Sequence, residues 1–233
     1  EIDPATLAFK AGDGLHGAFP CRSVESLVVL GSSGRAYSVA VSALPGGRGD
    51  GAPITTLIDL EPGTQPAHYF AGAADTLLLL ANTGGYGLLA QAGDLVSRQR
   101  AGKTFLSLEA GEHVLPPAVA VASHARVACL TVSGRLLVFP LDELKHQPNG
   151  GRGLTLMDVD GKDPLLSVAS FADVLRLLGQ GRGGKAKEET LRGTGLAEHV
   201  GRRARKGRKA AGFVKLLADA RGEVLLHLGL GQR

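Results

Sequence analysis

The sequence has no tryptophan, and phenylalanine and tyrosine together bring the aromatic share to only 4%. It has two cysteines, Cys21 and Cys129, which are too few for the disulfide framework of a small secreted domain. Cys129 stands in an apolar run, where a buried reduced thiol is expected, and this usage fits a reducing cytosol. No apolar run approaches the ~20 residues of a membrane-spanning helix. A core must therefore be built from aliphatic side chains, and a hydrophobic share of 44% is enough for one.

The first residues lack a basic segment followed by an apolar one, so a signal peptide is not expected. The chain does not begin with methionine, which leads us to expect a fragment of a longer protein.

Groupings typical of catalysis or metal binding are also missing. None of the seven histidines stands at ligand spacing from another histidine or a cysteine. No nucleophile–base set or carboxylate pair is identifiable from spacing. The stretch GQGRGGKA (179–186) approaches a phosphate-binding loop, but Ala186 replaces the serine or threonine that would hold Mg²⁺. We therefore expect no catalytic residue, no metal and no cofactor in this domain.

Glycine is abundant, with 34 residues, and it punctuates a repeat. Aligned on Gly34, Gly84 and Gly134, the repeat has a period of about 50 residues. An apolar run stands before each glycine and another after it, which predicts a β-hairpin closed by a glycine-bearing turn. The runs are apolar on both faces, as in strands buried inside a layered β protein.

Each unit offers two further strands. One follows a polar, basic, glycine-rich loop, and these candidates are 54–60, 104–108 and 154–159. Another closes the unit, near 68–71, 117–121 and 165–170. Four strands in about 50 residues are typical of propeller blades, which stack radially because none can bury its faces alone. No segment has a sustained helical period, so any helix should be a single turn.

The predicted fold is all-β and propeller-like, with about four to five four-stranded blades in one domain that spans residues 1–233. We assign 21–70, 71–119 and 120–170 to blades and 1–20 to the last strands of a truncated first blade. Residues 171–233 form a degenerate basic last blade, whose first strand is 175–178 and whose usual hairpin turn is replaced by GQGRGGK. Whether the ring closes is left open.

Charge is spread unevenly along the chain. Residues 1–170 hold 12 Lys/Arg against 16 Asp/Glu, whereas residues 171–233 hold 14 against 6. A basic end of this kind predicts a polyanionic partner. Its densest part is GRRARKGRK (201–209), which offers six candidate phosphate contacts: Arg202, Arg203, Arg205, Lys206, Arg208 and Lys209.

Basic residues in the loops of the other units form a second set. The candidates at matching repeat positions are Arg48, Arg98, Arg100, Lys103 and Arg152, and Arg182 and Lys185 stand in the last unit. Such an array would lie along one rim. Arg35 and Arg135 directly follow the turn glycine, where we favour a structural role.

The repeated phrases resemble a known family. SSGRAYSV (32–39), GYG (85–87), DLVSRQRAGK (94–103), VLPPA (114–118) and SGRLLVFPLDEL (133–144) are similar to the C-terminal domain of bacterial type IIA topoisomerase A subunits. FKAGDGL (9–15) at the start, the LVSRQRAGK loop and the basic last unit favour the topoisomerase IV branch over the gyrase branch.

The resemblance implies a β-pinwheel, in which neighbouring blades exchange strands. It implies a non-catalytic domain that binds and bends duplex DNA without sequence specificity on a basic outer rim and helps to select or deliver DNA crossings for decatenation and relaxation. It further implies Mg²⁺ and ATP for the full enzyme, handled outside this domain, a homodimer formed through other domains, and a partner B subunit that is the ATPase. The location implied is the bacterial cytoplasm, at the nucleoid, with no membrane contact and a monomeric isolated domain.

Two alternatives stay open. Gyrase A wraps DNA through a box resembling QRRGGKG, and here Arg100–Lys103 matches only part of it. The chain could therefore be a gyrase A domain that lacks a complete box. From another class, a propeller-like scaffold could use the acidic residues 1–170 to hold a basic protein.

Overall fold

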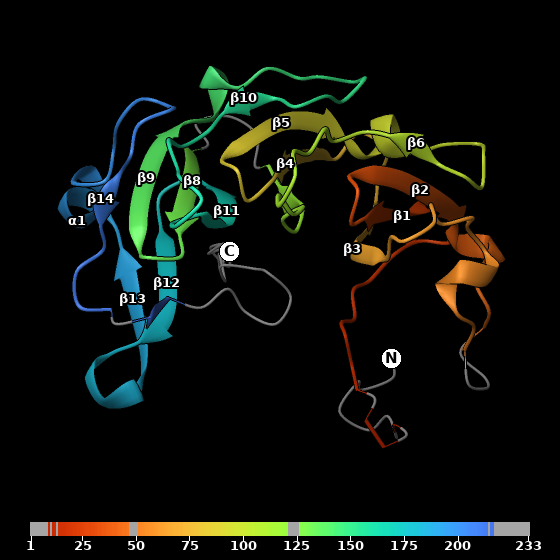
Figure 1. Cartoon of the computed structure of the whole chain (residues 1–233), viewed down its shortest axis with the longest axis horizontal. Helices are drawn as coiled ribbons and strands as arrows, with labels where there is room; N and C mark the ends of the chain where they lie inside the picture. The colour runs from red at the N-terminus through yellow and green to blue at the C-terminus, as the bar shows by residue number, and fades with distance from the viewer. Residues whose placement is uncertain are drawn as a thin grey trace, which may run out of the picture.

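The structure is a computed structural model that describes residues 9, 11, 12, 14–46, 51–120, 126–213, 215 and 216. Within these ranges, three four-stranded antiparallel sheets and one three-stranded sheet follow one another around an open arc (Figure 1). Besides short 3-10 helices, the described residues contain one α-helix of five residues, α1 (Gly193–Ala197), which precedes the basic loop near the C-terminal end of the arc. Regular structure is thus almost entirely β, as predicted.

Four hairpins form the centres of the sheets. They are β1 (Ser26–Gly31) with β2 (Arg35–Ala40), β4 (Leu77–Ala81) with β5 (Tyr86–Gln91), β8 (Arg126–Thr131) with β9 (Arg135–Pro140), and β12 (Leu175–Gln180) with β13 (Ala186–Leu191). On the inner side of the arc, each first strand pairs with a closing strand, which is β3 (Pro66–Gly72), β7 (Ala118–Val119), β11 (Leu165–Phe171) or β15 (Lys215–Leu216).

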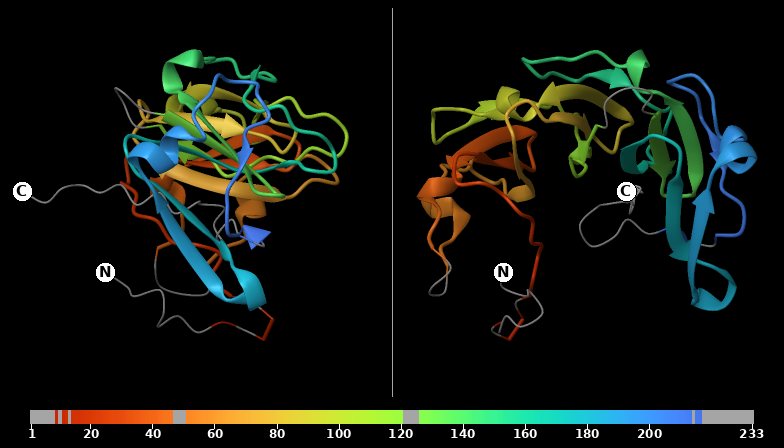
Figure 2. Two further views of the ribbon diagram at one scale, coloured as in Figure 1. Left: turned by 90° about the vertical axis from the view of Figure 1, so that its left-hand side faces the viewer. Right: turned by 180° about the vertical axis from the view of Figure 1, so that it is seen from behind.

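The fourth strand of a sheet comes from the following unit. β6 (Lys103–Thr104) pairs with β2, β10 (Leu154–Thr155) pairs with β5, and β14 (Arg208–Lys209) pairs with β9. We call β6, β10 and β14 the donated strands. They lie on the outer, convex side of the arc (Figures 1 and 2). The exchange of strands between neighbours, which the family resemblance implied, is thereby confirmed.

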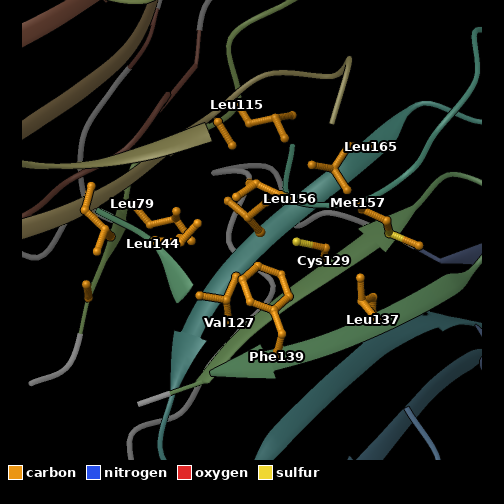
Figure 3. Packing of buried hydrophobic residues seen from close by; sticks show 14 residues of the cluster. Leu79, Leu115, Val127, Cys129, Leu137, Phe139, Leu144, Leu156, Met157 and Leu165 are labelled. Carbon is orange, nitrogen blue, oxygen red and sulfur yellow. The ribbon is translucent and has the colours of Figure 1, made fainter. Parts of the chain in front are cut away.

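The core lies between successive sheets because each hairpin strand is apolar on both faces. In β8, Val127 and Cys129 pack toward the second sheet, whereas Ala128 and Leu130 pack toward the fourth. Figure 3 shows the first of these clusters, in which Leu79 of the second unit meets Leu156 and Phe139 of the third. Dense aliphatic packing of this kind explains how a chain without tryptophan forms a core.

One predicted turn glycine was wrong. The second hairpin turns on Gly85, whose φ is +85°, and Gly84 has no positive φ. The hydrogen bond from Gly85 N to Asn82 O matches the one from Gly34 N to Gly31 O, so Gly85 is the equivalent of Gly34. Two adjacent glycines made the sequence alignment ambiguous by one residue.

The strand predicted at 54–60 is also wrong: Ile54–Thr56 is a short 3-10 helix, and the rest of the segment is irregular. In the later units the matching segment is the donated strand. Among the described residues, no sheet precedes the first hairpin, so this segment has no edge to join. The described part of 1–20 contains no strand, and its assignment to a truncated blade stays a prediction.

The hairpin of the last unit forms around the stretch that replaces the usual turn. β12 and β13 pair without a break from Leu175↔Leu191 to Gln180↔Ala186. The stretch GQGRGGK supplies the turn, with Gly183 and Gly184 at positive φ. This turn is longer than the others, in agreement with the expectation that GQGRGGK replaces the usual short turn.

Candidate nucleic-acid interface

The basic loops lead directly into the donated strands. A glycine with positive φ precedes each of these strands: Gly102, Gly153 and Gly207. A Cβ on any of them would meet a backbone oxygen of the preceding hairpin, at 2.3 Å for Gly102, 2.2 Å for Gly153 and 2.6 Å for Gly207. These glycines therefore let each loop approach the neighbouring sheet closely, and the same approach sets its basic residues on the outer side of the arc.

The residue after the turn glycine holds the incoming donated segment. In the first hairpin this is Arg35, whose side chain donates to the carbonyls of Ala101 and Gly102 and to Thr104 Oγ1. In the third hairpin it is Arg135, which donates to Lys206 O at 3.2 Å. Arg35 and Arg135 thus have the structural role predicted for them.

Asp163 supports Arg135. Its carboxylate accepts hydrogen bonds from Arg135 Nε at 2.7 Å and from Ser133 N at 2.7 Å, and the aspartate side chain is 13% exposed. Burial alone would raise the pKa of Asp163. The hydrogen bonds from Ser133, Arg135 and Thr131 outweigh that effect and lower the pKa.

In the second hairpin the arginine of this contact, Arg152, comes from the segment before the donated strand, and the hairpin supplies its partner. Tyr86 follows the turn glycine, and the guanidinium of Arg152 lies 4.0 Å from the centre of its ring. The carboxylate of Glu112 accepts hydrogen bonds from Nη1 and Nη2 of Arg152, and Glu109 Oε1 lies 3.3 Å from Arg152 Nη2. The hydrogen bonds from Arg152, more than any other cause, lower the pKa of Glu112. Arg152 is therefore committed to an ion pair between units, which argues against a primary role in binding an external anion.

The segment 202–209, which we call the loop 202–209 although its last two residues form β14, carries the largest set of available cations. Arg202, Arg205, Lys206, Arg208 and Lys209 are exposed, and no other described side chain forms an ion pair with them. Arg203 differs because it is half-buried. Its Nη1 donates to Thr155 O at 2.6 Å, and its backbone N–H donates to Glu143 Oε2.

The remaining candidates are scattered. Arg98 is exposed, Arg100 pairs with Asp59 at 3.2 Å, and half-buried Lys103 lies over the ring of Phe105. Lys185 is exposed in the turn of the last hairpin. Arg48 and the side chain of Arg182 lie outside the described residues. The geometry therefore brings the five exposed cations of 202–209 together and sets Arg152 and Arg203 apart as residues that hold the fold.

In the described part of the chain, no three His, Cys, Asp or Glu side chains come together as a metal site. Cys129 is buried, and burial raises the pKa of its thiol. No helix in the described ranges has the length and apolar character needed to cross a membrane.

Sequence reasoning missed Tyr86, Glu112 and Asp163. Tyr86 was detectable, since it stands at the position of Arg35 and Arg135 once the second turn is aligned on Gly85. The two acids stand in loops of irregular length, and no local pattern indicates which cation each one meets.

Comparisons with known proteins agree with this architecture. The family described as DNA gyrase C-terminal domain, beta-propeller, matches residues 76–120 and 126–172. The chain is 33% identical over 220 residues to the A subunit of DNA topoisomerase 4 from Salmonella typhimurium, and the match covers 93% of the chain and 29% of that protein. It is 36% identical over 218 residues to the corresponding protein of Neisseria gonorrhoeae, over 89% of the chain and 28% of that protein.

A solved structure extends the agreement to three dimensions. The C-terminal domain of E. coli ParC superimposes with a TM-score of 0.83 at 30% identity, over 93% of this chain and 89% of that one. The fold is thus a propeller-like β-pinwheel, and its described sheets follow an open arc. The chain belongs to the family of C-terminal domains of topoisomerase IV and gyrase A subunits. It spans less than a third of the length of the curated relatives it matches.

Proposed function

We propose that this chain is the non-catalytic C-terminal domain of a topoisomerase IV, within its DNA-cleaving A subunit. It binds duplex DNA through phosphate contacts on its outer loops, with little sequence specificity, and bends the duplex toward the rest of the enzyme. In this way it helps to select or deliver DNA crossings for decatenation and relaxation.

One observation carries the proposal: the five exposed cations of 202–209 have no described ion-pair partner, whereas Arg35, Arg135, Arg152 and Arg203 are all held by neighbouring units. Clustered unpaired cations on a convex surface suit a polyanion that follows the surface. Five neutralised phosphates would give a salt slope of about −4.5 in log–log form.

The rest of the catalytic cycle belongs outside this domain. The proposal includes a homodimer formed through other domains of the same polypeptide, a partner B subunit that is the ATPase, and Mg²⁺ and ATP bound elsewhere in the assembly. It sets the protein in the bacterial cytoplasm, at the nucleoid.

The test is a fluorescence anisotropy titration of a random 30-base-pair duplex with the 233-residue chain and with Arg202→Glu/Arg205→Glu. The proposal expects the variant to bind more weakly and with a flatter salt slope. Its matched control is Arg22→Glu/Lys162→Glu, which changes net charge equally at two exposed residues that are not among the candidate phosphate contacts. Equal affinities for the loop variant and the control would contradict the proposal, and no binding by any chain at low salt would favour a protein-interaction scaffold.

A further inference from the structure

The last hairpin departs from the pattern of the other three at its outer edge. β2, β5 and β9 each pair with a donated strand, whereas the order of the last sheet is β13-β12-β15. Within the described ranges, β13 therefore has no strand on its outer side. An edge of this kind presents unpaired backbone groups and is open to a ligand.

Lys185 stands at the position after the turn glycine, where the other hairpins have the residue that holds the donated segment. It directly follows Gly184, whose φ is +73°, just as Arg35, Tyr86 and Arg135 follow Gly34, Gly85 and Gly134. In the other hairpins this residue contacts a donated segment. Lys185 is exposed and has no such segment beside it among the described residues.

The charge of the hairpin is concentrated at its tip. In the stem, Arg176 pairs with Glu188 and Lys187 pairs with Glu189. The turn 181–185 contains Arg182 and Lys185 and no acid. The charges of the stem therefore balance, and the net positive charge of the hairpin lies in the turn.

The tip also stands clear of its surroundings. The other three turns are held by the segment before a closing strand, through Ser32 N to Gln65 O, Thr83 N to His113 O and Val132 N to Pro164 O. The described hydrogen bonds of the last turn are internal, from Gly181 N to Lys185 O and from Gly184 N to Gly181 O. A Cβ on Gly183 or Gly184 would meet no atom within 4 Å, and the hairpin projects away from the arc (Figure 2).

We propose that the turn 181–185 of the β12–β13 hairpin is a second phosphate-binding contact for duplex DNA, separate from the loop 202–209. Lys185 and Arg182 supply the charge, and the glycines let the backbone approach a phosphate without steric hindrance. The occupant is a polyanion because the turn contains two basic residues and no acid. The inference rests on the proposed function, since it extends the surface that contacts the same duplex from the outer loops to the last hairpin.

The test uses the 233-residue chain with Arg182→Glu/Lys185→Glu, beside Arg202→Glu/Arg205→Glu and the charge-matched control Arg22→Glu/Lys162→Glu. Each is titrated against a labelled random 30-base-pair duplex at several salt concentrations, after circular dichroism and thermal melting show an intact fold. Loss of two phosphate contacts should weaken binding about tenfold at 100 mM salt and reduce the salt slope by about 1.8. Arg182→Gln/Lys185→Gln should give a smaller loss in the same direction.

Three outcomes overturn the inference. If the loop variant loses affinity and the hairpin variant matches the control, the hairpin contact is absent while the proposed function stands. If the wild-type chain does not bind duplex at 50 mM salt, the proposed function fails and the hairpin contact fails with it. If the hairpin variant changes the oligomeric state in size-exclusion chromatography and leaves DNA affinity unchanged, β13 is a protein-docking edge.

Discussion

Arg152 and Glu112 form two parallel hydrogen bonds, from Nη1 to Oε2 at 2.9 Å and from Nη2 to Oε1 at 2.7 Å, although they belong to different units of the repeat. The pair ties the loop before β10 to the segment before β7, and Tyr86 covers the guanidinium. A residue predicted to contact DNA thus holds neighbouring units together.

Glu112→Gln should lower the free energy of unfolding by about 1–2 kcal/mol, because the charge-assisted fork loses its anion while Glu112 is only 12% exposed. Urea unfolding followed by circular dichroism measures the change. Glu188→Gln is the control, since Glu188 is 46% exposed and its loss should stay within about 0.5 kcal/mol. Equal losses at the two sites would show that the Arg152–Glu112 pair is not a special contact.

Acid should weaken the Arg152–Glu112 pair between units and the Arg135–Asp163 pair within the third unit. The folded pKa values of Glu112 and Asp163 are lowered, so the stabilisation is complete above the ordinary carboxyl pKa values of about 4 and is lost as pH falls through the lower folded values. Urea midpoints between pH 7 and pH 3 should fall less steeply for Glu112→Gln/Asp163→Asn than for the wild type. Parallel curves would refute the assignment.

Gly153→Ala should be far more damaging than Gly183→Ala. Both glycines have positive φ, so alanine meets similar backbone strain of about 1–2 kcal/mol at either site. Only at Gly153 would the new Cβ also lie 2.2 Å from Gly87 O, where β10 joins its host sheet. The difference between the two melting temperatures measures the cost of pushing the donated strand away, and similar values would count against tight strand exchange.

Arg202 and Arg203 should separate binding from stability although they are neighbours. Arg203→Ala removes the hydrogen bond to Thr155 O and should lower the melting temperature by several degrees. Arg202→Ala removes an exposed charge and should leave the melting temperature unchanged while it weakens duplex binding. Both variants need only thermal melts and one anisotropy titration, and the reverse assignment of effects would contradict the burial described for these residues.

The fold could be predicted from sequence wherever strand pairing is local. The hairpins at Gly34 and Gly134 combine apolar runs with a turn glycine, and both formed as expected. The failure at 54–60 has a different cause: its sequence matches 104–108, but a donated strand needs a neighbour's edge, which no local pattern reports.

The candidate site was predictable only as a supply of charge. Charge counts pick out 202–209, yet they treat Arg203 and Arg205 alike, although Arg203 is turned toward Thr155 and Arg205 is exposed. Which cations are free depends on contacts between residues about 30 to 70 positions apart, such as Arg135 with Asp163 and with Lys206. Such pairs are set by the exchange of strands and not by neighbouring residues in the sequence.

The central claim, that the loop 202–209 binds the phosphates of duplex DNA, is tested most directly by the salt dependence of binding. The affinity of the 233-residue chain for a random duplex would be measured from 50 to 250 mM salt, with Arg202→Gln/Arg205→Gln/Lys206→Gln alongside. The account predicts a wild-type log–log slope of about −4.5 or steeper, reduced by about 2.7 in the variant. A slope that the three substitutions leave unchanged would contradict it.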